Sequence, residues 1–238
     1  ESVVISDIKE LLDQQIEYNS RIAVEGLDGD WGANIGSVLL EVWGDDIKVR
    51  AKAMAAAGSD ARMGGCSLPV VIVSGSGNQG LTASLPVIEY AKELGVSRET
   101  LYRALVVSNL VTIHQKTGIG RLSAYCGAVS AGVGAGAGIT WLYGGRFKEV
   151  AHTIVNALAT VSGIICDGAK PSCAAKIATA VEAGMLGFYM YQKGQQFYGG
   201  DGIVKKGVEN TITNIGRLGR DGMRETDKEI IRIMVEED

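Results

Sequence analysis

Residues 122–143 read LSAYCGAVSAGVGAGAGITWLY, a stretch of 22 residues without a charged side chain. Arg121 and Arg146 flank it, and its length is that of a membrane span. About half of the stretch is Gly, Ala or Ser, however, so its transfer free energy into a bilayer is modest. No comparable second stretch follows. The composition therefore favours a buried central helix whose small residues allow neighbouring helices to approach closely.

The sequence around this stretch predicts a mainly α fold. In the N-terminal part, Ile8, Leu11, Leu12 and Ile16 recur at helical spacing. Gly and Pro interrupt the later apolar segments and separate them into further helices. Outside the central stretch, helices are expected over residues 5–24, 31–42, 45–63, 81–94, 98–114, 147–165, 173–190, 206–218 and 225–235.

A short apolar run and a glycine-rich loop break the helical period. Residues 67–73 read SLPVVIV, too short for a helix, and predict a strand-like segment. Residues 74–80 read SGSGNQG and supply hydroxyls, amides and backbone N–H groups where the next helix opens, an arrangement that receives anions. A plain connecting turn is the alternative, since no Gly-Lys-Ser/Thr follows to complete a phosphate-binding loop.

Composition and charge exclude several classes of protein. The chain has 23 basic and 27 acidic residues and a net charge of -4, without a basic stripe, so a nucleic-acid partner is not expected. Four cysteines in 238 residues, without a charged and apolar leader, indicate a reducing, cytoplasmic location and no disulfide framework. The chain begins at Glu1 instead of Met, and we expect a fragment of a longer protein.

Three cysteines lie where helices are expected to meet. Cys126 belongs to the small-residue stretch, and Cys166 and Cys173 bracket CDGAKPSC, in which Gly168 and Pro171 prevent a continuous helix. Three thiolates are enough for an iron-sulfur cluster that keeps one iron open for substrate. The spacing alone also fits buried, inert cysteines or a structural zinc site.

The motifs themselves resemble a known family. AYCGAVSAGVGAGAG and CDGAKPSC are similar to the alpha-chain region shared by iron-sulfur L-serine dehydratases and L-cysteine desulfidases. SGSGNQG and IHQKTGIGRLSAYCG resemble the desulfidase branch more closely. The resemblance implies a serine dehydratase alpha-chain-like domain over residues 1–238, in which Cys126, Cys166 and Cys173 hold a 4Fe-4S cluster. It also implies conversion of L-cysteine to pyruvate, ammonia and sulfide, with L-serine as the next substrate.

Within that resemblance, several residues are candidates for the chemistry. His114, Lys116 and Asp167 are the candidate catalytic residues. Alternatively, His114 is a solvated residue at a helix end, and Asp167 only balances nearby positive charge. His152 and Cys66 are expected to be structural. The candidate substrate-binding residues are Ser74, Ser76, Gly77, Asn78, Gln79 and Gly80, of which Ser76 and Asn78 are the preferred contacts.

One departure from the family affects the expected activity. Desulfidases carry a further N-terminal portion with a cysteine proposed for acid-base catalysis, and residues 1–65 contain no cysteine. We therefore expect association with a missing N-terminal portion, or a homo-oligomer that covers exposed apolar surface. A non-catalytic or redox-sensing domain that retains the fold is the alternative. Neither a membrane nor a nucleic acid is an expected partner.

Overall fold

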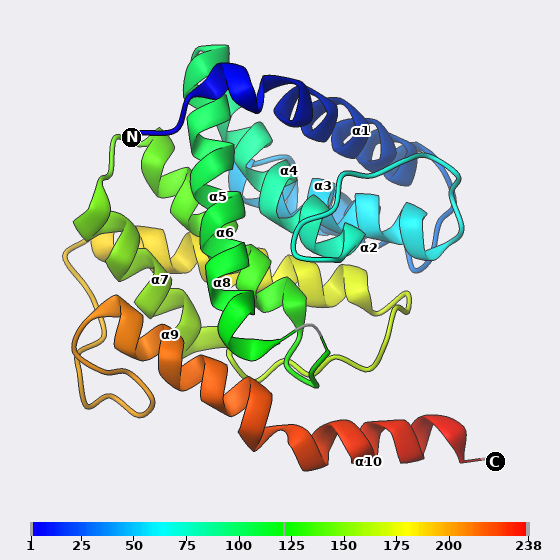
Figure 1. The fold of residues 1–238 in the computed structure, drawn as a ribbon. Helices are drawn as coiled ribbons and strands as arrows, with labels where there is room; N and C mark the ends of the chain where they lie inside the picture. The colour runs from blue at the N-terminus through cyan, green and yellow to red at the C-terminus, as the bar shows by residue number, and fades with distance from the viewer. Residues whose placement is uncertain (1, 121, 237–238) are drawn as a thin grey trace.

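The computed structural model describes residues 2–120 and 122–236, and these residues form a mainly α fold, as the sequence predicts (Figure 1). A short 3-10 helix (Ile5–Asp7) precedes α1, and a π-helical turn (Leu218–Gly222) joins α9 to α10. The helices of the described residues are α1 (Lys9–Asp28), α2 (Ile35–Trp43), α3 (Ile47–Met63), α4 (Gly77–Glu93), α5 (Arg98–Ile119), α6 (Gly127–Leu142), α7 (Phe147–Val161), α8 (Cys173–Gln192), α9 (Val208–Arg217) and α10 (Arg224–Val235).

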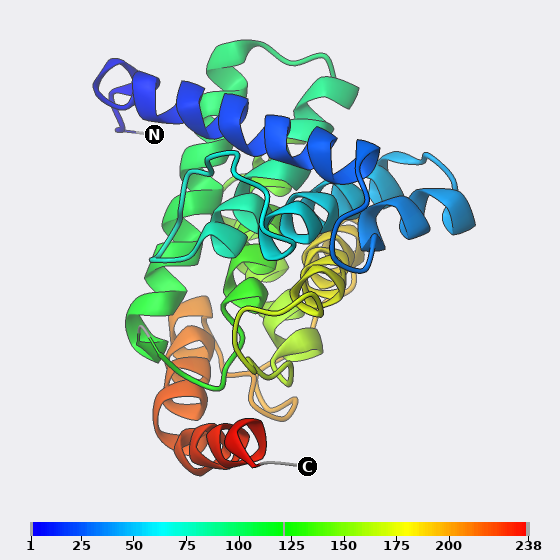
Figure 2. The ribbon, with the colours of Figure 1, turned by 90° about the vertical axis from the view of Figure 1, so that its right-hand side faces the viewer.

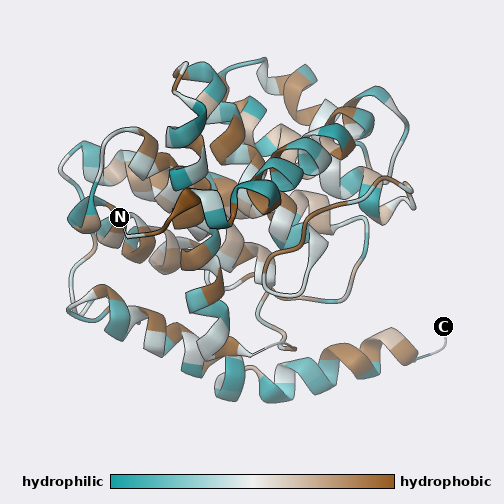
Figure 3. Cartoon of the chain, turned by 45° about the horizontal axis from the view of Figure 1, so that its top comes forward, coloured by the Kyte–Doolittle hydropathy of each residue, from teal (hydrophilic) through white to brown (hydrophobic). Residues whose placement is uncertain are grey.

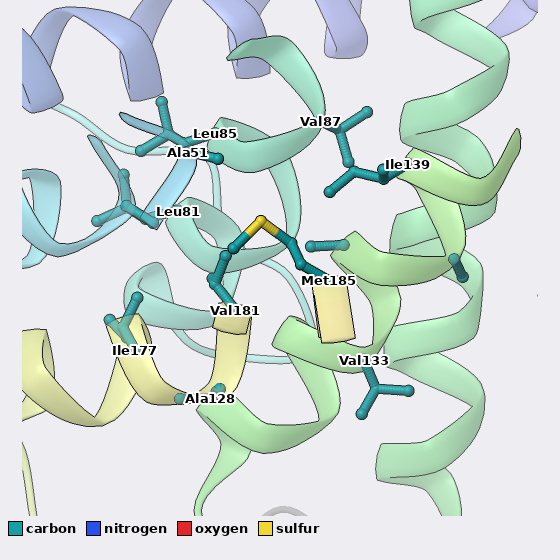
Figure 4. Close-up of a cluster of buried hydrophobic side chains, with 14 of the residues drawn as sticks. Ala51, Leu81, Leu85, Val87, Ala128, Val133, Ile139, Ile177, Val181 and Met185 are labelled. Atoms are coloured by element: carbon teal, nitrogen blue, oxygen red, sulfur yellow. The ribbon is translucent and has the colours of Figure 1, made fainter. Parts of the chain in front are cut away.

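The small-residue helix α6 is central, as predicted. It packs against α4, α5, α7 and α8, and every residue from 128 to 140 is buried. Ile139 of α6 lies beside Val87 of α4, and Val133 of α6 and Met185 of α8 belong to the same buried cluster (Figure 4). Among the residues that the structure describes, no helix is long and apolar enough to cross a membrane.

Glycines set the distance between α6 and α8. A Cβ atom added at Gly184 of α8 would overlap the carbonyl oxygen of Gly132 and come within 3.3 Å of the Gly136 nitrogen, both on α6. Gly132 in turn faces the backbone of Ala180. The two helices thus pack backbone against backbone, which only residues without a side chain permit. Figures 1 and 2 show α6 and α8 crossing in the middle of the molecule.

The structure corrects the region around the glycine-rich loop. Residues 67–73 are extended but pair with no strand in the described chain, and the one bridge there joins Val73 to Ser76. Helix α4 begins at Gly77, four residues earlier than predicted. Gly77 and Gly80 lower helix propensity, but they allow the first turn to lie against residues 70–72, and that packing outweighs propensity.

Further boundaries also differ from the prediction: α1 ends four residues later, at Asp28, and α2 begins four residues later, at Ile35. Helix α5 continues five residues past His114 to Ile119, because no Gly or Pro follows before Gly118. Helix α7 ends at Val161, four residues before the predicted end. The β-branched pair Ile164 and Ile165 then runs extended, and Ile165 forms a bridge with Tyr125.

Helix α10 lies apart from the bundle (Figures 1 and 2). None of its residues is buried, and it packs against the π-helical turn before it. Its last turns carry the exposed residues Ile231, Ile233, Met234 and Val235, and the cartoon coloured by hydropathy shows this end as apolar (Figure 3).

Candidate active site

Backbone hydrogen bonds hold Cys126 and Cys166 side by side. The Cys126 N–H donates to the carbonyl of Ile164 at 3.1 Å, and the Cys166 N–H donates to the carbonyl of Ala124 at 2.6 Å. These bonds join the extended residues before α6 to those after α7, and the two thiols form a hydrogen bond with each other. The backbone therefore holds these two cysteines next to each other, although they are 40 positions apart in the sequence.

Cys173 joins this pair from the other side of the 166–173 loop. It is the first residue of α8, and its thiol donates to the carbonyl of Gly168 at 3.5 Å. Gly168 has a φ of +94°, a conformation that favours glycine and turns the chain back toward Cys166. Cys173 is also among the groups whose charge would raise the pKa of Cys126, so it belongs to the same neighbourhood.

Among the described residues, no group of three His, Cys, Asp or Glu side chains could hold a single metal ion. An iron-sulfur cluster does not require its ligands to meet at one point. Each thiolate binds a different iron, so the ligand sulfurs stand further apart than around a single ion. The donor set consists of three thiols and no imidazole, which is the ligand chemistry of an iron-sulfur cluster.

The pKa values of Cys126 and Cys166 are shifted in opposite directions. The hydrogen bond from Cys126 lowers the pKa of Cys166 to about 6, despite the burial that opposes its charge. The same hydrogen bond, together with burial, raises the pKa of Cys126 well above its usual value. Near neutral pH the first thiolate of the pair therefore resides on Cys166.

This asymmetry predicts how the two thiols react with an alkylating reagent. Because the thiolate is the nucleophile, alkylation of Cys166 by iodoacetamide should rise as the pH increases through about 6 and then level off. Cys126 should remain unmodified over the same range, since burial and its hydrogen bond keep it protonated. Mass spectrometry of the labelled peptides checks this. Equal labelling of Cys126 and Cys166 at pH 7 would contradict the assigned asymmetry.

Lys116 is a buried amine beside the thiols. Its residue is 6% exposed on α5, and its ammonium makes no hydrogen bond or ion pair with the residues that the structure describes. Burial lowers the pKa of Lys116, while the charges of Cys166 and Cys126 partly oppose that shift. A buried amine with a lowered pKa carries a larger neutral fraction, which can accept a proton.

A cavity opens beside Lys116. Its volume is about 750 Å³, and it brings the glycine-rich loop to the C-terminal end of α5. A small amino acid fits within such a volume. The cavity is lined by Ser74, Gly75, Ile113, Lys116, Thr117, Gly120 and Leu122.

The other predicted loop residues have distinct positions. Ser76 precedes the first turn of α4, and the buried Asn78 carboxamide oxygen accepts a hydrogen bond from Arg62 Nη1 at 3.2 Å. Gln79 lies against Gly127, directly after Cys126, because a Cβ atom at Gly127 would overlap its carboxamide. Gly77 faces Arg62 and Gly80 faces the Val71 carbonyl, so both glycines permit close packing.

His114 and Asp167 have partners of their own. His114 is exposed, and its Nε2 lies 2.7 Å from a carboxylate oxygen of Glu209 on α9. It does not line the cavity that contains Lys116. The Asp167 carboxylate is paired with the ammonium of Lys176, and this hydrogen bond holds the pKa of Asp167 below its usual value. Asp167 is thus the nearer of the two to the cysteines, within the 166–173 loop.

Sequence reasoning missed two polar residues near the start of α6. Gln115 Nε2 donates to the Ser130 carbonyl at 3.3 Å, while Gln115 Oε1 and Ser130 Oγ are buried without a hydrogen-bond partner among the residues that the structure describes. Gln79 Oε1 is also buried without a partner. Buried polar atoms are normally satisfied, so these three oxygens fit a site that receives a polar ligand or water. A Gln and a Ser on helices gave no motif that could have revealed them.

The chain is similar to a family model and to several curated proteins. A family model described as "Serine dehydratase alpha chain" matches residues 1–232. A UPF0597 protein of Desulfitobacterium hafniense is 71% identical over 99% of this chain and 55% of its own length. UPF0597 proteins of Lachnoclostridium phytofermentans and Finegoldia magna are 59% and 52% identical over 98% and 99% of the chain, and 56% of their own lengths. No solved structure matches the chain.

The curated relatives are longer than this chain. The chain spans about half the length of the curated relatives that it matches.

Proposed function

The chain belongs to the serine dehydratase alpha chain family, and on this premise we propose that it is the cluster-binding part of an iron-sulfur lyase. The proposed reaction is β-elimination from L-cysteine, which yields pyruvate, ammonia and sulfide. The observation that carries the proposal is the meeting of Cys126, Cys166 and Cys173 beside the buried Lys116 and its cavity.

The residues present fit a 4Fe-4S cluster. Three thiols from three separate segments converge, and Gly127 lets the Gln79 carboxamide lie against the residue that follows Cys126. The unpartnered oxygen of Gln79 lies at the same place. Cys126, Cys166 and Cys173 would hold the cluster. When bound, it supplies a Lewis-acidic iron that polarises the substrate carboxylate and the leaving group.

The chain's own residues would bind the amino acid and move its proton. The neutral amine of Lys116 accepts the α-proton at Nζ, in keeping with its lowered pKa. The electron pair of the Cα–H bond then forms the Cα–Cβ double bond as the Cβ–S bond breaks and sulfide departs. Tautomerisation of the resulting enamine and hydrolysis of the imine release ammonia and leave pyruvate. Ser74 and Gly75, which also line the cavity, would orient the substrate.

L-serine is the second candidate substrate, and the description of the matching family favours it. Elimination from L-serine breaks a Cβ–O bond by the same proton transfer. Assays under anaerobic conditions distinguish the two activities. Release of sulfide and pyruvate from L-cysteine supports a desulfidase. Release of pyruvate from L-serine, without activity on L-cysteine, supports a dehydratase. The assays should use this chain alone and joined to the remaining part of the Desulfitobacterium relative. A cluster-loaded protein that releases pyruvate from neither substrate in either form would refute the proposed lyase.

Replacing Lys116 by Met tests the proposed base. A general base contributes about 100-fold or more to the rate, so the Lys116→Met variant should lose at least that factor in kcat. Its iron content should remain unchanged, because Lys116 is not a cluster ligand. Lys193→Met, which removes an exposed lysine at the end of α8, is the matched control and should keep full activity. Equal activity of both variants would exclude Lys116 from catalysis.

A further inference from the structure

A second cavity lies on another part of the molecule. It has a volume of about 520 Å³ and lies between α7, the loop that follows α8, and the start of α9. None of the three cysteines and none of the residues around Lys116 lines it. Its floor includes the buried residues Val155 and Val204.

Aromatic side chains stand exposed at this cavity. Phe147 at the start of α7 is 79% exposed and Tyr198 in the loop is 63% exposed, although both are large. Phe197 and His152 also line the cavity, and the His152 ring stacks on Tyr191 with centroids 4.4 Å apart. Exposed aromatic side chains around a cavity are typical of a site that binds a planar apolar group.

The walls of the cavity are held in place by hydrogen bonds. The Phe197 N–H donates to Asn156 Oδ1 at 3.0 Å, and the buried Asn156 donates to the Gly187 carbonyl at 3.2 Å. On the opposite wall, the backbone of Lys205 exchanges two hydrogen bonds with the buried Thr211 hydroxyl. The cavity is thus formed before any ligand binds, as small-molecule sites usually are.

Positive charge surrounds the cavity. Lys148, Lys205 and Lys206 line it, and none of them forms an ion pair with a residue in the described part of the chain. Glu209 is the one carboxylate among the lining residues, and His114 is hydrogen-bonded to it. Gly207 caps α9 without a side-chain hydrogen bond, so the backbone N–H groups of the first turn add positive potential.

We propose that this cavity binds a small planar or aromatic molecule that carries one anionic group. The apolar body would lie between Phe147 and Tyr198, and the anionic group would face Lys205, Lys206 and the start of α9. A volume of about 520 Å³ lies within the range of about 300 to 1,000 Å³ that small-molecule sites occupy. The site is separate from the proposed active site and is independent of its chemistry.

Two dyes that differ by one sulfonate test the proposal on the 238-residue chain. 8-Anilino-1-naphthalenesulfonate carries the anionic group, and N-phenyl-1-naphthylamine has the same rings without it. Fluorescence titration should show one saturable site for the sulfonate. The double variant Lys205→Gln/Lys206→Gln should weaken sulfonate binding about tenfold, because charge-assisted contacts are lost, and leave the uncharged dye within about twofold.

Two further variants make the result specific. Lys48→Gln/Lys228→Gln removes the same charge from exposed lysines on α3 and α10 and should leave both dyes unaffected. Ala151→Trp, which fills the cavity from α7, should abolish binding of both dyes. Sulfonate binding that is unchanged in the first double variant, or equally weakened in the control double variant, would overturn the proposal. So would binding that survives Ala151→Trp.

Discussion

Replacing Cys166 by alanine should abolish cluster binding and, with it, lyase activity. Anaerobic reconstitution of the unmodified chain is expected to give about four irons per chain, and Cys166→Ala should retain fewer than about one. Cys166 is the proposed ligand whose pKa is lowered to about 6, so it supplies the thiolate most readily at neutral pH. Its removal leaves two thiols, one of them Cys126, whose pKa is raised. Iron analysis and the absorbance of the cluster measure the loss.

Cys66→Ala is the matched control for this variant. Cys66 follows α3 and is not among the groups that affect the ionisation of Cys126 or Cys166. The control variant should keep its full iron content and activity. Equal iron in Cys166→Ala and the unmodified chain would show that Cys166 is not a ligand, and a loss in Cys66→Ala would show that the assigned set is wrong.

Replacing Gly184 by alanine should destabilise the fold strongly. Helix propensity alone favours alanine over glycine by about 1 kcal/mol. At Gly184, however, the added Cβ would overlap the Gly132 carbonyl oxygen and lie 3.1 Å from its carbon. Backbone atoms cannot move aside as a flexible side chain can, so α6 and α8 must separate. We expect a net loss of about 3 kcal/mol in the free energy of unfolding, measured by urea denaturation.

Gly118→Ala supplies a control within another helix. Gly118 lies in α5, and the nearest atom to an added Cβ is the Gly216 Cα at an ordinary contact distance of 3.5 Å. This variant should be neutral or more stable by up to about 1 kcal/mol. The opposite signs expected for the two substitutions separate packing from helix propensity. If Gly184→Ala were as stable as Gly118→Ala, the close α6–α8 contact would be incorrect.

Helix pattern and composition predicted much of the architecture. The apolar periodicity of residues 9–63 and the uncharged stretch around α6 were sufficient, because both reflect which faces are buried. The start of α4 was missed for a physical reason. Gly77 and Gly80 disfavour a helix locally, but their contacts with residues 70–72 exist only after folding. Tertiary packing of this kind leaves no periodic signal in the sequence.

The candidate site was predicted less completely. The cysteines were found because CDGAKPSC carries helix-breaking residues and a family resemblance. The pairing of Cys126 with Cys166 depends on the bridge between Tyr125 and Ile165, which forms between segments 40 residues apart. The proximity of Lys116 to the thiols likewise follows from how α5 packs against α6. Such long-range contacts were not visible in the spacing of residues.

The central claim is that Cys126, Cys166 and Cys173 hold an iron-sulfur cluster. Iron and acid-labile sulfide should be measured together on the anaerobically reconstituted chain, beside a variant in which all three cysteines are replaced by alanine. We expect about four irons and about four sulfides per chain, and neither in the triple variant. Iron without sulfide, or equal amounts of both in the two proteins, would contradict it.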